Sequence, residues 1–265
     1  MELFAFDVDG TLVQGDEPLT ELDVREMNYH LAKGDAICIA TGRPVTGATR
    51  YLAQLLDSPN RFAVGANGSF VESFSGERIA SLGLTYADYL KIRELCLSPE
   101  RSVYVYIGNE IGFHEYSFVV DEEYRWNRMT GKVDFNLTPL APTAPITKIV
   151  VCSKAGDNQA LERYMADKVP AGLRMLRSSP VFLEFINPLA DKAEGVRMLA
   201  ERLGISDPEH IHAFGDAMND YRMIATFDGT AMGNAVPEIK SVAKRVARPV
   251  SEDGVGHALA DWFHN

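Results

Sequence analysis

The chain has 265 residues, a formal net charge of −11 and 46% hydrophobic residues. That length and apolar content suffice for one large hydrophobic core or two smaller ones. The acidic balance argues against a general nucleic-acid binder, because no broad basic surface is available to neutralise a phosphate backbone. A small phosphorylated molecule could still bind to such an acidic protein, provided that a metal ion or a few positively charged side chains attract its phosphate.

Three cysteines, Cys38, Cys96 and Cys152, lie in apolar stretches without metal-site spacing, and an odd number cannot complete a disulfide framework. They predict free, buried thiols in a reducing compartment. No secretory signal is apparent, and no uncharged apolar run approaches the roughly 20 residues that span a bilayer. We therefore expect a cytoplasmic protein, monomeric or a small homo-oligomer, with neither membrane nor nucleic acid as a partner.

The first eighty residues alternate between apolar runs and helical patterns. Buried strands are predicted over 3–6, 36–40 and 62–65. Residues 19–33 carry apolar side chains at helical spacing before Gly34, and a second helix is predicted after Pro44. This rhythm predicts a doubly wound, mainly parallel α/β sheet that binds ligands at the carboxyl ends of its strands.

The pattern changes after Asn67-Gly68. A hairpin is predicted over 69–82 and a helix over 85–97. Further strands are predicted over 103–107, 112–118, 146–152, 173–176 and 182–186, with a helix over 158–168 and a Pro-rich stretch at Pro139, Pro142 and Pro145. This block is predicted to be an inserted α+β domain with antiparallel pairing.

The first rhythm returns near Lys192. The predicted elements are a helix over 193–203, a strand over 211–214, a short helix, a strand over 230–232 and a terminal helix over 255–263. We therefore expect a discontinuous catalytic core, formed by residues 1–82 and 187–265, around an inserted domain at 83–186.

Two aspartates follow the first predicted strand directly. Asp7 is expected at the carboxyl end of that strand, where its carboxylate could attack phosphorus and form an acyl phosphate. Asp9 could protonate the leaving oxygen and later deprotonate the hydrolytic water. Gly10 allows a sharp turn, which the Thr11 hydroxyl could hold. An acidic pair in a loop more often caps a helix or is solvated, so its position at a strand end is what favours catalysis.

A second acidic strand end occurs at Asp216. Together with Asp7 and a backbone carbonyl, it would form the kind of oxygen ligand set that Mg²⁺ prefers. The metal would offset the repulsion between these carboxylates and a phosphate. Asp216 and Asp220 could instead cap a helix; the metal interpretation is preferred because both strand ends carry Asp.

Two further positions could contact a phosphate. Thr41, followed by Gly42 and Arg43, ends the second predicted strand, and its hydroxyl with nearby backbone amides could hold phosphoryl oxygens at a helix N-terminus. In isolation, a helix-capping threonine beside a surface arginine explains the segment equally well. Lys192 lies at a helix start, where a cation opposes the macrodipole. This suggests neutralisation of transferred phosphate, although a solvated lysine also explains it.

Together these residues resemble the motifs of the haloacid dehalogenase-like hydrolases, in particular the Cof-type phosphatases with the larger α+β cap. The matching segments, in order, are Phe6-Asp7-Val8-Asp9-Gly10-Thr11-Leu12, Ala40-Thr41-Gly42-Arg43, Lys192, and Gly215-Asp216 through Asn219-Asp220. Smaller matches at Asn67-Gly68, 231–235 and 252–255 extend the resemblance over nearly the whole chain.

The resemblance implies an Mg²⁺-dependent phosphomonoester hydrolase that acts on a small phosphorylated metabolite, such as a sugar phosphate or a phosphorylated vitamin precursor, through an aspartyl-phosphate. It implies that Asp7 is the nucleophile and Asp9 the acid/base. Mg²⁺ would be held by Asp7, the Asp9 carbonyl and Asp216, with Asp220 supporting the metal or Lys192 from behind. The implied substrate-binding residues are Thr41, Gly42, Arg43, Lys192 and Asn219.

Two alternatives stay open. A phosphomutase of the same superfamily has a similar opening motif, but Thr41-Gly42-Arg43 and the compact segment 215–220 favour the phosphatase. A non-catalytic phosphometabolite sensor would be expected to lose one of the key side chains, and none is lost. Substrate identity would be set by the inserted domain, where the polar and aromatic candidates are Tyr104, Tyr106, His114, Tyr116, Tyr124, Trp126 and Glu184.

Overall fold

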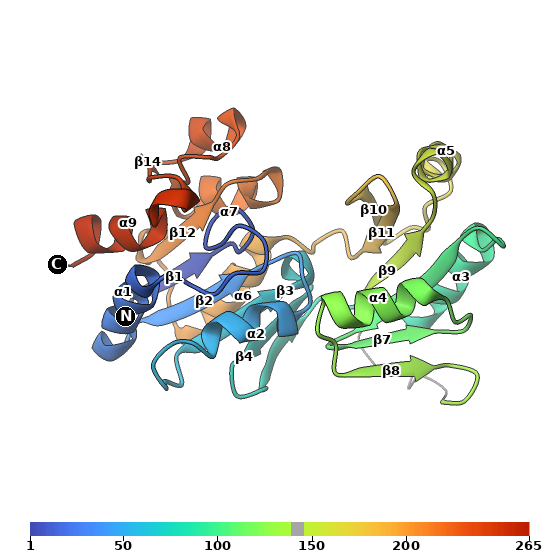
Figure 1. Ribbon diagram of the computed structural model, residues 1–265, viewed down its shortest axis with the longest axis horizontal. Helices are drawn as coiled ribbons and strands as arrows, with labels where there is room; N and C mark the ends of the chain where they lie inside the picture. The colour runs from blue at the N-terminus through green and yellow to red at the C-terminus, as the bar shows by residue number, and fades with distance from the viewer. Residues whose placement is uncertain (139–145, 265) are drawn as a thin grey trace. The chain divides into compact units, whose positions relative to one another are not determined.

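The computed structural model describes residues 1–138 and 146–264, which form two compact units (Figure 1). The core unit comprises residues 1–80 and 191–265, and the inserted unit comprises residues 81–190. The predicted Pro-rich stretch at Pro139, Pro142 and Pro145 lies outside the described residues. Within the described residues, no helix combines the length and the apolar character that crossing a membrane requires.

An eight-stranded sheet forms the core unit, in the order β14-β13-β12-β1-β2-β3-β4-β5. Its strands are β1 (Leu3–Phe6), β2 (Ala36–Ala40), β3 (Arg61–Gly65), β4 (Phe70–Ser73), β5 (Arg78–Ser81), β12 (Ile211–Gly215), β13 (Asp228–Ala231) and β14 (Arg245–Val246). Strand β1 pairs in parallel with β12 and with β2, and β2 with β3, whereas β4 runs antiparallel to β3. The carboxyl ends of β1, β2, β3 and β12 therefore meet at one edge of the sheet.

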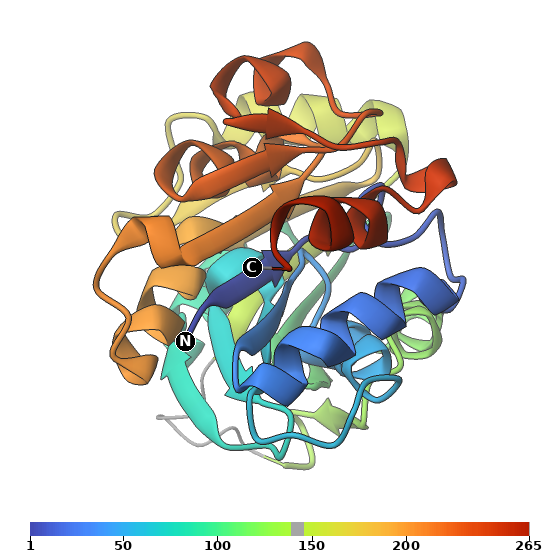
Figure 2. The same cartoon turned by 90° about the vertical axis from the view of Figure 1, so that its left-hand side faces the viewer.

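Helices cover both faces of this sheet, as Figure 2 shows for α1 and α9 on one side and α6 and α7 on the other. The helices are α1 (Glu21–Lys33), α2 (Val45–Leu52), α6 (Lys192–Leu203), α7 (Tyr221–Thr226), α8 (Pro237–Val242) and α9 (Gly254–Trp262). Short 3₁₀ turns occur at η1 (Ala66–Gly68), η2 (Pro208–His210), η3 (Met218–Asp220) and η4 (Val250–Glu252). Because both faces are covered, β1 and β2 are apolar along their whole length and fully buried.

Local sequence explains where α1 begins and ends. The Thr20 hydroxyl accepts a hydrogen bond from the Asp23 backbone N–H at 3.1 Å, which satisfies one free donor of the first turn. The helix stops at Gly34, which adopts φ 89° and caps the last carbonyls. Of the residues predicted as this helix, Leu19 and Thr20 lie before it, with Thr20 as its cap.

The inserted unit has a six-stranded sheet in the order β10-β11-β9-β6-β7-β8. Its strands are β6 (Ser102–Ile107), β7 (Glu110–Phe113), β8 (Gly131–Asp134), β9 (Ile146–Cys152), β10 (Arg174–Arg177) and β11 (Phe182–Ile186), and its helices are α3 (Tyr86–Cys96), α4 (Phe118–Trp126) and α5 (Ala155–Met165). The strands pair antiparallel except for β7 with β8. The expected antiparallel pairing is therefore confirmed for most of this sheet, and the parallel pair of β7 with β8 makes the sheet mixed.

The strand predicted over 112–118 is wrong beyond Phe113. Residues from Phe118 onward form α4, with Ser117 as the residue that precedes the first turn. The run Phe118-Val119-Val120 has high strand propensity, yet only Val120 of the whole helix is buried. Val119 and Tyr124 pack partly buried beside Val120, so only a short apolar stripe marks this helix. Neither α4 nor the following strand β8 was predicted.

The three cysteines are free thiols, as predicted. Cys38 and Cys96 are buried, whereas Cys152 is half-buried, so the expectation of full burial is wrong for that residue. Burial raises the pKa of the Cys96 thiol to about 11 and that of Cys152 to about 11. Neither thiol is therefore activated as a nucleophile.

Candidate active site

Two predicted acidic strand ends meet at one edge of the core sheet. Asp7 follows β1, and its backbone N–H donates to the Phe214 carbonyl of β12 at 3.0 Å. This hydrogen bond extends the pairing of β1 with β12 by one residue, towards Asp216. One carboxylate oxygen from each of Asp7, Asp216 and Asp220 lies within 4.8 Å of the other two. Asp220 is fully buried and Asp7 is 5% exposed. We call these three residues the acidic cluster.

Lys192 lies against this cluster and is fully buried. Its Nζ lies 2.5 Å from Asp7 Oδ1 and 2.6 Å from Asp220 Oδ1. As predicted, the residue lies at a helix start: it opens α6, where the Asp191 carboxylate accepts a hydrogen bond from the Ala193 N–H. Full burial against two carboxylates excludes the solvated lysine that the sequence left open.

The pKa shifts of these residues show that the positive charge of Lys192 does not balance the negative charge of the acidic cluster. Burial raises the pKa of Asp7 to about 8, with the charge of Asp220 adding to it and Lys192 opposing it. Burial and Asp220 likewise raise the pKa of Asp216 to about 6. Burial alone would lower the pKa of Lys192, but Asp7 and Asp220 outweigh it and raise that pKa above its ordinary value. One ammonium thus faces three carboxylates.

A divalent cation fits this donor set, since hard cations prefer carboxylate oxygens. Both oxygens of Asp220 are already engaged, Oδ1 by Lys192 and Oδ2 by the backbone N–H groups of Asp216 and Ala217 at 3.0 and 3.1 Å. Asp216 accepts only the longer hydrogen bonds from Thr11 at 3.4 Å and Asn234 at 3.5 Å, and Asp7 is engaged by Lys192 through Oδ1. Asp7 and Asp216 are therefore the side chains best able to offer an oxygen to a metal. Asp220 holds Lys192 and the turn after β12 from behind.

The turn after Asp9 is shaped by the position of Asp216. Gly10 adopts φ +87°, and a Cβ at this position would lie 2.3 Å from Asp216 Oδ2. The Thr11 hydroxyl donates to Asp216 Oδ1 at 3.4 Å, so it contacts the opposite strand end, whereas we expected it to hold its own turn. Asn234 donates from its side chain to the Gly10 carbonyl at 2.8 Å and was not predicted as a site residue.

Asp9 forms an ion pair with Arg43. The Nε of Arg43 donates to Asp9 Oδ2 at 3.0 Å, and its Nη2 donates to Oδ1. Nη2 also reaches the Gly15 carbonyl at 3.4 Å, and Nη1 lies 3.7 Å from Asp16. The sequence assigned Arg43 to substrate, but this guanidinium contacts the proposed acid/base directly, a pairing that sequence spacing could not reveal.

Thr41 lies at the carboxyl end of β2 and is 1% exposed. Its hydroxyl accepts a hydrogen bond from the Arg43 backbone N–H at 3.1 Å. The residue that precedes α2 is Pro44, and among the described residues no side chain caps this helix. Thr41 is therefore not the N-cap of α2, and its neighbour Gly42 lies half-buried in the same turn.

Asn219 comes from the turn η3 after β12 and is exposed. Its side-chain amide donates to Asn67 Oδ1 at 3.5 Å. All nine predicted site residues thus belong to the core unit, at or just beyond the carboxyl ends of β1, β2 and β12, or at the start of α6.

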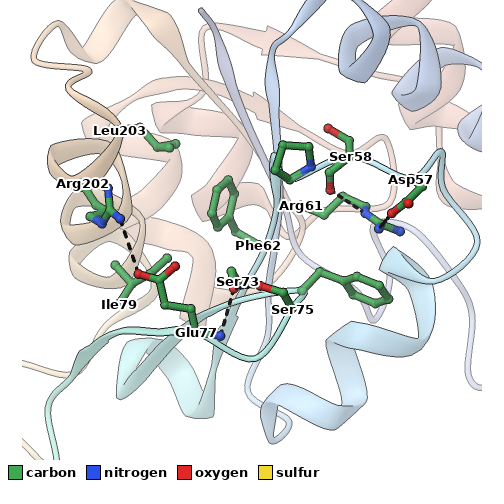
Figure 3. Close-up of a pocket in the computed structure, with 12 residues that line it drawn as sticks. Asp57, Ser58, Arg61, Phe62, Ser73, Ser75, Glu77, Ile79, Arg202 and Leu203 are labelled. Carbon is green, nitrogen blue, oxygen red and sulfur yellow. Dashed lines mark hydrogen bonds and ion pairs between the residues drawn. The ribbon is translucent and has the colours of Figure 1, made fainter.

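A cavity of about 590 Å³ lies at the amino end of β3, away from these strand ends (Figure 3). Arg61 lines it, but its guanidinium donates to the Ser58 carbonyl at 3.0 Å, the Leu52 carbonyl at 3.2 Å and Asp57 at 2.5 Å. A second arginine, Arg202, contacts Glu77 at 3.4 Å. Both arginines of this cavity are therefore engaged by groups of the protein itself.

The candidates in the inserted unit range from buried to exposed side chains. Tyr104 and Tyr106 are buried, and the Tyr106 hydroxyl donates to Glu123. Glu184 accepts hydrogen bonds from Lys148 at 2.8 Å and Ser178 at 2.9 Å. The remaining candidates are His114, which contacts the hydroxyls of Tyr86 and Tyr89, half-buried Tyr124, and exposed Tyr116 and Trp126.

Comparisons with known proteins give a consistent result. Residues 4–259 match the haloacid dehalogenase-like hydrolase family. The chain is 27% identical to the 5-amino-6-(5-phospho-D-ribitylamino)uracil phosphatase YitU of Bacillus subtilis, over 98% of this chain and 97% of that protein. It is 26% identical to an HMP-PP phosphatase of Serratia proteamaculans, over 99% and 96%. A crystal structure of a haloacid dehalogenase-like hydrolase from Bacteroides thetaiotaomicron superposes with a TM-score of 0.86 at 26% identity, covering 99% of both chains.

Proposed function

Because this chain belongs to the haloacid dehalogenase-like hydrolases, in their Cof-type group, and is a phosphatase, we propose that it hydrolyses phosphomonoesters of small metabolites through an aspartyl-phosphate on Asp7. The observation that carries this proposal is the buried contact of Asp7 with Lys192 beside Asp216. A carboxylate held in this way, at the strand end where α/β enzymes bind ligands, is placed to act as a nucleophile.

In the first step, an Asp7 carboxylate oxygen attacks phosphorus and the bond from phosphorus to the ester oxygen breaks. Asp9 donates a proton to the departing oxygen, which leaves as an alcohol. Lys192, with Thr41 and the backbone amide of Gly42, would stabilise negative charge on the phosphoryl oxygens. The full burial of Lys192 strengthens this interaction, since little water competes for its charge.

In the second step, the ionised Asp9 takes a proton from a water molecule, which attacks phosphorus of the acyl phosphate. The phosphorus–oxygen bond to Asp7 breaks, inorganic phosphate leaves and the Asp7 carboxylate is regenerated. Asp9 is suited to exchange between the two steps because its side chain is 53% exposed, so both a leaving group and a water molecule can reach it.

The acidic cluster can bind a metal ion, and we propose Mg²⁺ with Asp7, Asp216 and the Asp9 carbonyl as ligands. When bound, the metal would reduce the repulsion between the carboxylates and the phosphate. The raised pKa of Asp7 supports this assignment, because a nucleophilic carboxylate must be ionised and the residues themselves do not supply enough positive charge. Asp220 would act only on Lys192 and the turn after β12.

The substrate is proposed to be a phosphorylated metabolite of the size handled by the relatives. Two of them are named for 5-amino-6-(5-phospho-D-ribitylamino)uracil and for HMP-PP. A phosphorylated vitamin precursor or a sugar phosphate is therefore the class to test first, and we propose that the inserted unit selects among them.

A phosphatase screen tests the proposal. The purified protein with Mg²⁺ is expected to release inorganic phosphate from members of a panel of sugar phosphates, nucleotides, pyridoxal phosphate and flavin precursors. Asp7→Asn is expected to abolish turnover and to prevent a covalent phosphate, detected by mass spectrometry after a rapid acid quench. Asp261→Asn, at an exposed aspartate in α9, is the matched control. Retained turnover in Asp7→Asn would refute the nucleophile, and isomerisation of a hexose phosphate without phosphate release would favour the mutase.

A further inference from the structure

The turn η1 after β3 has an unusual backbone. Ala66, Asn67 and Gly68 all adopt positive φ, at 49°, 53° and 91°. A non-glycine residue in this region costs roughly 1–2 kcal/mol, and such strain persists only where the surroundings fix it, most often at functional sites. Two successive non-glycine residues at the carboxyl end of β3 therefore require an explanation.

Contacts on both sides hold this turn in place. The Ala66 N–H donates to the Arg43 carbonyl at 2.7 Å, and the Asn67 N–H donates to the Thr41 carbonyl at 3.0 Å. On the other side, a Cβ on Gly68 would lie 1.9 Å from the Asp191 carbonyl oxygen. The turn is therefore fixed between the loop that follows β2 and the residue that precedes Lys192.

This backbone brings the Asn67 side chain beside two proposed substrate-binding residues. Its Oδ1 accepts a hydrogen bond from the Asn219 amide at 3.5 Å. A Cβ on Gly42 would lie 3.1 Å from Asn67 Oδ1 and 3.4 Å from Nδ2, so the glycine leaves room for the amide. Within the part of the chain that the structure describes, Asn67 Nδ2 donates no hydrogen bond to another residue.

The phosphoryl oxygens of a substrate need several hydrogen-bond donors. An ammonium group has three N–H donors, and two of those of Lys192 already bind Asp7 and Asp220. The guanidinium of Arg43 binds Asp9. Thr41 and the Gly42 amide are the other proposed donors, and a phosphoryl group with three oxygens can accept more hydrogen bonds than these groups supply. The amides of Asn67 and Asn219 lie together where the loops after β3 and β12 meet.

We propose that Asn67 is a substrate-binding residue whose side-chain amide donates to a phosphoryl oxygen beside Asn219. The strained turn positions the Asn67 side chain. The backbone hydrogen bonds to the carbonyls of Thr41 and Arg43 hold this turn at a fixed place beside the loop after β2. This inference rests on the proposed function, because it places the phosphoryl group next to Gly42 and Asn219.

Two substitutions distinguish the contribution of the Asn67 side-chain amide from that of the strained backbone. Asn67→Gly removes the amide but accepts the positive φ without strain, whereas Asn67→Ala removes the amide and adds strain. Asn67→Gly is expected to keep the wild-type melting temperature and to lose roughly 10- to 100-fold in kcat/KM, the range for a hydrogen bond to a charged group. The inhibition constant for orthovanadate is expected to rise by a similar factor. Asn67→Ala is expected to be less stable than Asn67→Gly.

Wild-type kcat/KM and orthovanadate inhibition in Asn67→Gly would overturn the proposal and leave Asn67 with a backbone role alone. If Asn67→Gly does not fold, Asn67→Asp keeps the shape of the side chain and replaces the donor with a negative charge; unchanged orthovanadate affinity in that variant would equally refute the contact. Orthovanadate binding with Mg²⁺, measured by calorimetry, distinguishes this failure from failure of the proposed function. An inactive wild-type protein that binds orthovanadate, with weakened binding in Asn67→Gly, would refute the reaction and retain the binding residue.

Discussion

The Nζ of Lys192 lies 2.6 Å from Asp220 Oδ1, and both side chains are fully buried. The same nitrogen contacts Asp7 at 2.5 Å. One cation thus joins the start of α6 to the carboxyl end of β1 and to the turn after β12. This geometry makes Lys192 both a proposed phosphate ligand and a structural ion-pair partner, and the two roles can be separated.

Lys192→Met is expected to lower the free energy of unfolding by about 3–5 kcal/mol, because it leaves two buried carboxylates without their cation. The double variant Lys192→Met/Asp220→Asn is expected to regain a large part of that stability, since one of those carboxylates is removed, but to remain inactive. Urea unfolding in metal-free buffer and phosphate release measure the two properties. Lys91→Met, at an exposed lysine in α3, is the control. Equal stability of the single and double variants would contradict the ion-pair role.

Arg43 is expected to act on the leaving group through Asp9. Arg43→Gln should leave Asp9 without its guanidinium partner, and misplacement of an acid costs roughly 100-fold in rate. The loss should be large for an alkyl phosphate, whose leaving oxygen needs a proton, and small for p-nitrophenyl phosphate. The measurement is kcat for both substrates in Arg43→Gln and Asp9→Asn, with Arg25→Gln as a control at an arginine of α1 whose side chain is 71% exposed.

The comparison of Arg43→Gln with Asp9→Asn decides between two roles for Arg43. A matching leaving-group dependence in Arg43→Gln and Asp9→Asn supports positioning of Asp9 by Arg43. An equal loss on both substrates, with a raised KM, would instead show that Arg43 contacts the phosphoryl group as the sequence suggested. Absence of a leaving-group effect in Asp9→Asn itself would contradict the acid role of Asp9.

Mg²⁺ is expected to stabilise the protein through the acidic cluster. At a concentration of 100 times its dissociation constant, a ligand that binds only the folded state adds about 2.7 kcal/mol. Asp216→Asn should remove most of this gain. Gly10→Ala should weaken it as well, because the added Cβ would meet Asp216 Oδ2 at 2.3 Å. Thermal unfolding with and without Mg²⁺ measures the effect, with Asp261→Asn as the control. An unchanged Mg²⁺ response in Asp216→Asn would exclude this residue as a ligand.

Much of the core could be predicted from sequence because its strands are buried on both faces. The predicted bounds 3–6, 36–40, 146–152 and 182–186 match β1, β2, β9 and β11. Asp7 and Asp216 could be placed together because parallel strands carry their ends to one edge. Burial of Lys192 was not predictable, since its helix-start position fits a solvated side chain equally well.

The contacts that sequence missed all depend on tertiary packing. Arg43 and Asp9 are 34 residues apart, and Asn234 reaches the Gly10 carbonyl across 224 residues. Spacing along the chain carries no information about such pairs. A polar residue after β13, the strand next to β12, was the available signal for Asn234. The positive φ of Asn67 is likewise imposed by residues that are its neighbours in space, whereas the sequence showed only an Asn-Gly pair at this position.

The burial of Asp23 predicts that the stability of the protein depends on pH, independently of the active site. This residue of α1 is 2% exposed and accepts a hydrogen bond from the Gly256 N–H of α9 at 2.7 Å. Burial raises the pKa of Asp23 from 3.8 to about 6, against the opposing hydrogen bonds of Thr20 and Gly256. Between these two pH values the folded protein binds the proton more tightly than the unfolded chain does, so the contribution of Asp23 to stability falls as pH rises.

Asp23→Asn keeps the acceptor oxygen and removes the charge. Relative to the wild type it is expected to be stabilising by up to about 3 kcal/mol near pH 7, with the difference disappearing towards pH 4, where Asp23 is protonated in the folded state. Urea midpoints measured across this range give the result. Asp261→Asn should show no comparable trend. A stability difference that is constant with pH would mean that burial does not raise the pKa of Asp23, and a destabilised Asn variant near pH 7 would mean that the carboxylate charge is needed to join α1 to α9.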